Sequence, residues 1–319
     1  MISRKTAARP AWRERLLLTL FFLVAGSHAA VLPTAAADFD VFEATIEDIN
    51  RAFDENRLTS EQLVRYYLER IEAYEDEGPG INALVTVNPE ALARAQALDR
   101  ERAGKGPRSL LHGIPVIVKE SYDTADLPTT AGSVTLKGSL PAKDGTIVQR
   151  LRSAGAVVIG KANMSEFALS QGWFGYSSLG GLTRNPYNLK RNASGSSSGS
   201  AAAVSANFTV LATGTDTAGS VRAPAAVTGV VGLKPTLGLT SRDGIVPAAL
   251  SFDVAGPLAR TVTDTAIMLG FMTGVDEGDP RTKESQGHYS KDYRASLSED
   301  ALAGVRLGVA RQYLGGNPE

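Results

Sequence analysis

The chain has 319 residues, of which 43% are hydrophobic and 21% charged, and its formal net charge is −1. This length and composition suffice for a globular core, and the near-neutral charge gives no reason to expect nucleic acid as a partner. The sequence contains no cysteine and three histidines. Disulfides, thiolate catalysis and cysteine-based metal sites are therefore excluded. Three histidines provide few ligands for a histidine metal site.

The first 37 residues predict a secretory signal peptide followed by a short N-terminal extension. A basic stretch from Arg4 to Arg15 precedes the apolar run 16–26, and Ser27-His28-Ala29 then fits a small-x-small cleavage site. The apolar run is too short to span a bilayer comfortably. We therefore expect an exported protein, periplasmic or secreted, without a stable membrane span, whose folded domain covers residues 38–319.

Helical and strand-like segments alternate along residues 38–319. Thr59 and Gln62 fit a capping box, which predicts a helix from Ser60 to Tyr74. The segments expected after it are a strand over 84–87, a helix over 89–102, a strand over 114–118 that ends at Lys119, a helix over 146–153, a strand over 156–159, a short helix over 201–204, and strands over 209–213 and 227–233. This alternation predicts an α/β layered domain.

The end of the chain contains one more strand-like segment. Residues 305–310, Val-Arg-Leu-Gly-Val-Ala, predict a strand shortly before the last residue, Glu319. A strand that opens a new unit usually pairs with later strands, so we expect the domain to be truncated at its C-terminus.

Lys119 is the first candidate for chemistry. It ends an apolar strand, where partial desolvation would disfavour the charged form of its amine. A neutral amine can act as a general base. The alternative is a lysine that reaches from the strand end into solvent.

Two later segments supply hydroxyls and backbone donors. The Ser- and Gly-rich segment 194–200 allows close backbone approach, although the same composition is typical of flexible linkers. The segment 214–222 places a turn of small residues after an apolar strand. Such a turn can direct successive N–H groups at one point, as an oxyanion hole requires; the alternative is an ordinary tight turn capped by serine.

These segments, Gly113–Glu120, Ser194–Ala201 and Gly214–Arg222, together with Gly229–Thr236 and Ser241–Ile245, occur in the order in which they occur in the amidase signature family. From about residue 40 to 319 the chain resembles that family, and within it the bacterial peptide amidases. The resemblance implies the amidase signature fold, a mixed central β-sheet covered by helices on both faces. It also implies hydrolysis of a linear carboxamide, with C-terminal peptide amides among the candidate substrates.

The resemblance also assigns roles to residues. It implies a Ser-Ser-Lys triad of Ser220 as nucleophile, Ser196 as the middle member held by a cis peptide bond, and Lys119 as base. The implied oxyanion donors are the N–H groups of Thr217, Ala218, Gly219 and Ser220, and the implied supporting residues are Ser197, Asp216 and Arg222. Most relatives carry glycine where Ala218 stands. An acyl-enzyme formed in this way needs no metal or organic cofactor, and the expected partner is a small-molecule or peptide amide; no oligomeric state is favoured.

Two other functions are compatible with the same motifs. One is an amidotransferase A-type subunit that releases ammonia for tRNA-dependent amidation, against which the predicted signal peptide counts. The other is a catalytically dead exported binding protein of the same fold, against which the intact Lys119, Ser196 and Ser220 count.

Two short patterns suggest other chemistry. Residues 195–199 also fit G-x-S-x-G, which would make Ser197 a nucleophile with His288 as its base; however, the polar run before this segment is a poor strand. Residues 155–161 resemble the start of a phosphate-binding loop ending at Lys161, but Ala162 replaces the required Ser or Thr, so we interpret the segment as core.

Overall fold

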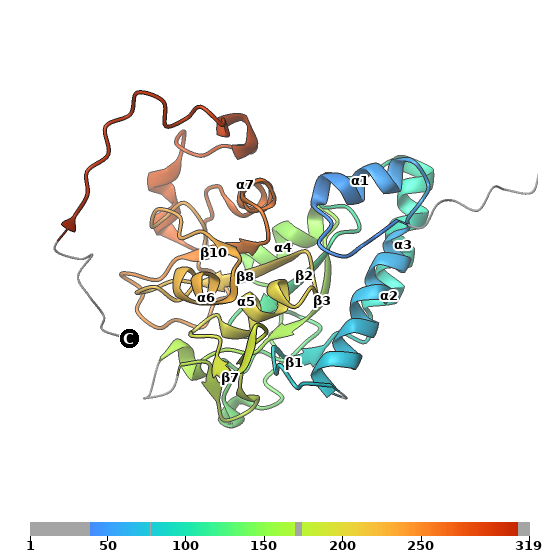
Figure 1. Ribbon diagram of the computed structural model, residues 1–319, viewed down its shortest axis with the longest axis horizontal. Helices are drawn as coiled ribbons and strands as arrows, with labels where there is room; N and C mark the ends of the chain where they lie inside the picture. The colour runs from blue at the N-terminus through green and yellow to red at the C-terminus, as the bar shows by residue number, and fades with distance from the viewer. Residues whose placement is uncertain (1–38, 77, 170–173, 312–319) are drawn as a thin grey trace, which may run out of the picture. The chain divides into compact units, whose positions relative to one another are not determined.

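A mixed six-stranded sheet organises the computed structural model, which describes residues 39–76, 78–169 and 174–311 (Figure 1). The strand order is β1-β3-β2-β8-β10-β9. The bounds are β1 Leu84–Val87, β2 Pro115–Lys119, β3 Val157–Ala162, β8 Leu211–Thr215, β9 Val231–Gly232 and β10 Ala255–Ala259. β2 is parallel to β3 and β8, whereas the β1–β3, β8–β10 and β10–β9 pairs are antiparallel. The predicted signal peptide lies outside the described residues.

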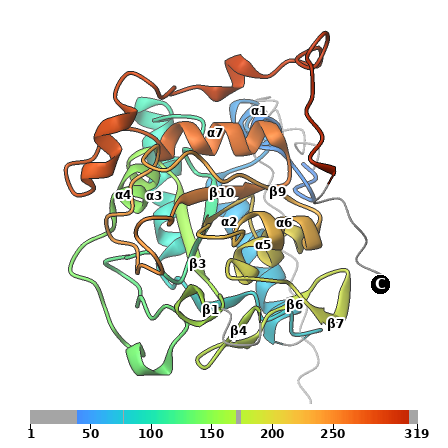
Figure 2. The same ribbon diagram turned by 90° about the vertical axis from the view of Figure 1, so that its left-hand side faces the viewer.

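Helices pack against this sheet, which confirms the predicted α/β class with a mixed central sheet. Their bounds are α1 Ile46–Asp54, α2 Ser60–Ile71, α3 Ala91–Lys105, α4 Thr146–Ser153, α5 Ser198–Ser205, α6 Arg222–Thr228 and α7 Val262–Met272. α2 packs along α3, which contacts β3, whereas α7 lies across β8, β9 and β10 (Figures 1 and 2). α5 contacts five strands of the sheet, so its first turn is fixed relative to the strand ends.

Smaller elements complete the described chain. They are the paired strands β4 Tyr176–Ser177 and β5 Gly181–Leu182, the hairpin of β6 Arg184–Asn185 and β7 Asn188–Asn192, the π-helical turn Glu72–Asp76, and 3-10 turns at Val134–Leu136, Glu166–Ala168, Pro280–Ser285 and Tyr293–Ser296. In the described residues, no helix is both long and apolar enough to cross a membrane.

The central strands are buried, and their residues are largely apolar. Every residue of β2, β3, β8 and β10 is buried, and such strands read as near-continuous apolar runs. The small residues of α5 allow it to approach the sheet closely. A Cβ on Gly199 would lie 2.2 Å from the carbonyl oxygen of Ala83, so only glycine fits there.

Apart from shifts of two or three residues in the bounds of other elements, such as α5 and β8, three sequence predictions differ from the structure. The helix predicted to reach Tyr74 ends as an α-helix at Ile71 and continues as a π-helical turn. The predicted strand 227–233 is largely wrong: α6 extends through Thr228, Gly229 ends it at a φ of 70°, and the strand is limited to β9. The strand predicted at 305–310 is also wrong, because this segment is exposed and has no pairing partner in the part of the chain that the structure describes.

Lys161 belongs to the core, as the sequence predicted. Lys161 lies in β3 with no exposed surface, and its amine donates hydrogen bonds of 2.7 Å and 3.0 Å to the carbonyl oxygens of Tyr122 and Pro128. It also contacts two threonine hydroxyls, and the buried Glu120 lies 3.8 Å away. Burial lowers the pKa of Lys161 to about 8, against the opposing effect of Glu120. The ammonium therefore holds the loop 120–130 together.

Replacing Lys161 with alanine should destabilise the fold strongly. The variant leaves Glu120 buried and removes the donor to Tyr122 and Pro128, and breaking a buried ionic pair in this way costs about 3–5 kcal/mol. Urea denaturation measures this loss in the free energy of unfolding. The matched control is Lys190→Ala on the exposed strand β7, for which we expect a change within about 0.5 kcal/mol. Equal effects of the two substitutions would contradict this role of Lys161.

Candidate active site

The carboxyl ends of β2 and β8 meet at one edge of the sheet because the two strands are parallel. Lys119 is the last residue of β2, and Thr215 is the last residue of β8. Ser196 and Ser197 immediately precede α5, and the turn 216–221 leads from β8 into α6. The fold therefore brings together the three segments that the sequence predicted to carry chemistry.

Lys119 is fully buried and surrounded by hydroxyls. Its Nζ lies 2.7 Å from Ser196 Oγ, 2.7 Å from Thr215 Oγ1 and 3.1 Å from Ser197 Oγ. No carboxylate among the described residues forms an ion pair with it. Burial lowers the pKa of Lys119 to about 7, although the charges of Asp216 and Asp253 act in the opposite direction. A substantial fraction of the amine is thus neutral near pH 7.

The hydrogen bonds of the Ser197 hydroxyl have a fixed direction in this cluster. Its hydroxyl donates to the Thr215 carbonyl at 3.3 Å and accepts the Thr215 N–H at 3.2 Å. It can therefore meet Lys119 only as an acceptor. A neutral amine has two N–H groups, which Ser197 and Thr215 can accept, and one lone pair, which is then left for the hydroxyl proton of Ser196.

Ser196 is held by its backbone. The peptide bond between Gly195 and Ser196 is cis, as the resemblance implies, and the Ser196 carbonyl accepts the Ser165 N–H at 3.0 Å. The Ser165 hydroxyl in turn accepts the N–H of Gly175 at 2.9 Å. These contacts fix the position of the Ser196 backbone.

Ser220 lies beside this cluster and is half-buried. Its carbonyl accepts the Ser197 N–H at 3.1 Å, which places the two loops side by side. Its hydroxyl has no hydrogen-bond partner among residues 39–76, 78–169 and 174–311. The structure therefore forms the Lys119–Ser196 contact directly and brings Ser220 near it without a hydrogen bond to Ser196.

The Asp216 side chain binds the backbone of the turn to which it belongs. Its fully buried carboxylate accepts the N–H groups of Gly219 at 2.7 Å, Val221 at 3.2 Å and Arg222 at 3.3 Å, and it pairs with the Arg222 guanidinium at 3.0 Å. Burial raises the pKa of this carboxyl, but these hydrogen bonds outweigh it and hold the pKa well below its usual range. Asp216 and Arg222 therefore support the turn. The Asp216 carboxylate makes more of the contacts, because it binds three backbone N–H groups as well as the Arg222 guanidinium.

The predicted oxyanion donors divide into two groups. The N–H groups of Thr217, Ala218 and Ser220 have no acceptor within the described chain. The N–H of Gly219 differs from the prediction, because it points at Asp216. Ala218 keeps its N–H free although it stands where glycine was expected, and its φ is not in the left-handed region.

Sequence reasoning missed three residues that contact the site. Thr215 accepts a hydrogen bond from Lys119, Lys234 donates to the Thr217 carbonyl at 2.9 Å, and Asp253 accepts the Thr217 hydroxyl at 2.6 Å. Thr215 and Lys234 lie inside the motifs quoted above, so both residues could have been identified as candidates from the sequence. Asp253 carries no local signal beyond a lone acid shortly before an apolar strand.

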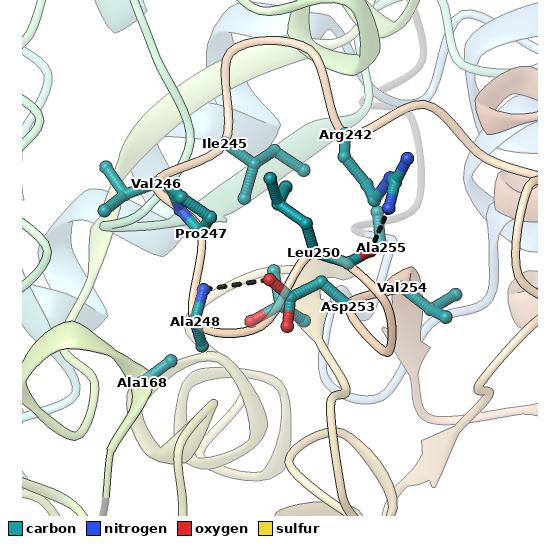
Figure 3. Close-up of a pocket in the computed structure, with 11 residues that line it drawn as sticks. Ala168, Arg242, Ile245, Val246, Pro247, Ala248, Leu250, Asp253, Val254 and Ala255 are labelled. Carbon is teal, nitrogen blue, oxygen red and sulfur yellow. Dashed lines mark hydrogen bonds between the residues drawn. The ribbon is translucent and has the colours of Figure 1, made fainter. Parts of the chain in front are cut away.

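A pocket adjoins the cluster, because Thr215 is one of its lining residues. Figure 3 shows the pocket together with Asp253. Its wall is largely apolar and is formed by Ala168, Ile245, Val246, Pro247, Ala248, Leu250, Val254 and Ala255. Arg242 also lines it, but its guanidinium pairs with Asp279 and donates to the Leu250 carbonyl. The pocket thus offers apolar surface next to the hydroxyl cluster.

The alternative with Ser197 as nucleophile finds no support in the geometry. Ser197 contacts Lys119 and Thr215, whereas His288 is exposed and has no side-chain hydrogen bond in the described residues. No group of three histidine or carboxylate side chains that could hold a metal occurs in the part of the chain that the structure describes.

Removing the Asp216 carboxylate should cost much more stability than removing its surface partner. In Asp216→Ala, three backbone N–H groups lose their acceptor, and each unsatisfied group costs about 1–3 kcal/mol when buried. Arg222→Ala removes only an exposed side chain, for which we expect less than about 1 kcal/mol. Urea denaturation of both variants measures the difference, and a larger loss for Arg222→Ala would contradict it.

Comparison with known proteins identifies the family. A family model described as Amidase matches residues 62–319. The chain is 46% identical to the solved peptide amidase of Stenotrophomonas maltophilia, with a TM-score of 0.80 over 82% of this chain and 54% of that one. It is 45% identical to a probable amidase of Arabidopsis thaliana over 87% of this chain and 55% of the relative. It is also 43% identical to the A-type subunit of the glutamyl-tRNA(Gln) amidotransferase of Geobacter sulfurreducens, over 86% and 55%. The chain spans about half the length of these relatives, and it belongs to the amidase family.

Proposed function

We propose that the protein hydrolyses a linear carboxamide through an acyl-enzyme, with Ser220 as nucleophile, Ser196 as proton relay and Lys119 as base. The observation that carries this proposal is the Lys119 amine, buried without a carboxylate partner in the described chain and 2.7 Å from Ser196 Oγ. A pKa lowered to about 7 suits a base that must be neutral when it acts and charged when it returns the proton.

The first half of the reaction is a double proton shift. As Ser220 Oγ attacks the amide carbonyl carbon, its proton moves to Ser196 Oγ, and the Ser196 proton moves to the Lys119 lone pair. Ser220 must approach Ser196 when substrate binds, since hydrogen bonds of a catalytic site often tighten only in the complex. The negative oxygen that forms would be stabilised by the free N–H groups of Thr217, Ala218 and Ser220.

The second half reverses the relay. When the tetrahedral intermediate collapses, the C–N bond breaks and the proton held by Lys119 returns through Ser196 to the leaving amine. Water then attacks the Ser220 ester with the same relay as base, which releases the carboxylic acid and restores the free hydroxyl. Every proton is carried by the three side chains, so the cycle closes without a further group.

A C-terminal peptide amide is the substrate class that we propose. The likeness to a solved peptide amidase at 46% identity supports it. We also propose export of the protein, because the basic, apolar and small-residue order of residues 4–29 is that of a signal peptide.

Similarity to the A-type subunit of an amidotransferase supports a second candidate, the release of ammonia from an amide for transfer to tRNA-bound amino acids. The two functions differ in the acyl donor. Hydrolysis of peptide amides with no hydrolysis of free glutamine would favour the first, and the reverse pattern would favour the second.

Three alanine variants test the proposed roles. Ser220→Ala should abolish acyl-enzyme formation, and Lys119→Ala should reduce kcat by about 10⁴-fold or more, because members of a relay fail together. Ser197→Ala should cost far less, about tenfold to a hundredfold, since Ser197 only orients the amine. Steady-state hydrolysis of an amidated dipeptide and mass spectrometry of the trapped enzyme measure these effects. Hydrolysis retained by Ser220→Ala, or a greater loss in Ser197→Ala than in Lys119→Ala, would refute the assignment.

A further inference from the structure

Asp253 contacts the turn that carries the free N–H groups. No sequence motif indicated this residue. Its carboxylate accepts the Thr217 hydroxyl at 2.6 Å and the N–H groups of Ala248 and Ala249 at 2.9 Å and 2.8 Å. The side chain is 6% exposed, and no Lys or Arg of the described residues forms an ion pair with it. Figure 3 shows the carboxylate directed at the chain near Ala248.

This single carboxylate joins two separate parts of the site. Ala248 belongs to the pocket wall, and Thr217 begins the turn that ends at Ser220. Each carboxylate oxygen is committed to one part, Oδ1 to Thr217 and Oδ2 to the wall. The position of the wall is therefore tied to the position of the turn.

Thr217 has three polar groups, and two of them are occupied. Asp253 accepts from the hydroxyl, and Lys234 donates to the carbonyl at 2.9 Å. The N–H alone has no acceptor in the described part of the chain. With the peptide held at both of these points, the direction of the remaining N–H is fixed before substrate arrives, which is the condition for an effective oxyanion donor.

We propose that Asp253 is a positioning residue that orients the Thr217 N–H toward the developing oxyanion and couples it to the pocket wall. The inference rests on the proposed function, since it concerns the same reaction at Ser220. Asp253 does not touch the reacting atoms; it acts through Thr217.

Asp253 also influences Lys119 through its charge. Among the described residues, the charges of Asp216 and Asp253 act on Lys119, and the cations Arg222 and Lys234 contact Asp216. Both carboxylates raise the pKa of Lys119 against the effect of burial. Loss of the Asp253 charge should therefore lower that pKa and extend activity to lower pH, a change that a residue needed only for packing would not produce.

The test measures the reactivity of Ser220 with a fluorophosphonate probe, in which Ser220 Oγ bonds to phosphorus and fluoride leaves. This reaction needs the nucleophile and the N–H donors but no turnover of an amide. The variants are Asp253→Asn, which keeps the size of the side chain, Thr217→Val, which keeps the carboxylate, and the double variant. The control is Asp264→Asn, a carboxylate 1% exposed that accepts the Ile46 N–H at 3.0 Å at the start of α7.

We expect Asp253→Asn and Thr217→Val each to lower the labelling rate at its high-pH plateau by about tenfold, less than the hundredfold or more of a deleted donor. The double variant should lose no more than about twofold beyond the worse single variant, because both changes break one contact. Only Asp253→Asn should move the pH midpoint of labelling downward, and Asp264→Asn should change neither quantity.

Wild-type rates and an unmoved midpoint in Asp253→Asn, or an equal loss in Asp264→Asn, would overturn the role of Asp253 while leaving Ser220 as the nucleophile. Should Asp253→Asn fail to fold, a wild-type plateau in Thr217→Val overturns the role by itself, and a tenfold loss there supports it. A wild-type protein that the probe does not label at Ser220 would contradict the proposed function and the role of Asp253 with it.

Discussion

The site depends on one physical constraint, an amine buried at the end of a strand with hydroxyls as its only hydrogen-bond partners among the described residues. Lys119 has no exposed surface, and its three hydrogen-bond neighbours are uncharged hydroxyls. Such surroundings solvate an ammonium less well than water does, so they favour the neutral amine. The rest of the site determines where the lone pair of that amine points.

Comparison with Lys161 shows how the partners decide the outcome. The two lysines lie on adjacent parallel strands, in register one residue apart, and both are fully buried. Besides two threonine hydroxyls, Lys161 faces two carbonyl oxygens, which can only accept, and a carboxylate at 3.8 Å. These partners favour the charged form, so Lys161 serves as a structural cation. Lys119 lacks them and is available as a base.

The fold class was predictable because it depends on local pattern, whereas the segments of the candidate site were indicated by their joint resemblance to the amidase signature family. The capping box at Thr59, the apolar run that ends at Lys119 and the small-residue turn before Ser220 are contiguous in sequence, and the structure places each as expected. Where tertiary contacts decide, prediction failed. The segment 227–233 has apolar residues suited to a strand, but α6 extends into it and Gly229 ends that helix. The segment 305–310 has strand-like residues but no partner in the described chain.

Within the site, the sequence could not supply the particular hydrogen-bond partners, whether within the turn or between distant segments. Nothing in the sequence indicates that the Gly219 N–H is occupied by Asp216, or that Asp253, 36 residues beyond Thr217, accepts its hydroxyl. Asp216 acts from within the turn, whereas Asp253 contacts the turn from a separate segment. Residue type could suggest a set of donors, but only the folded geometry determines which of them remain free.

Titration of Lys119 itself tests most directly whether this amine can act as the base. Protein labelled with ¹³C at lysine Cε, with the Lys119 signal assigned by its absence from Lys119→Met, would report the protonation of this amine by NMR. We expect a midpoint near pH 7, because burial lowers the pKa of this amine. A midpoint near the ordinary lysine value of about 10.4 would show that the amine stays charged at neutral pH and would contradict its role as the base.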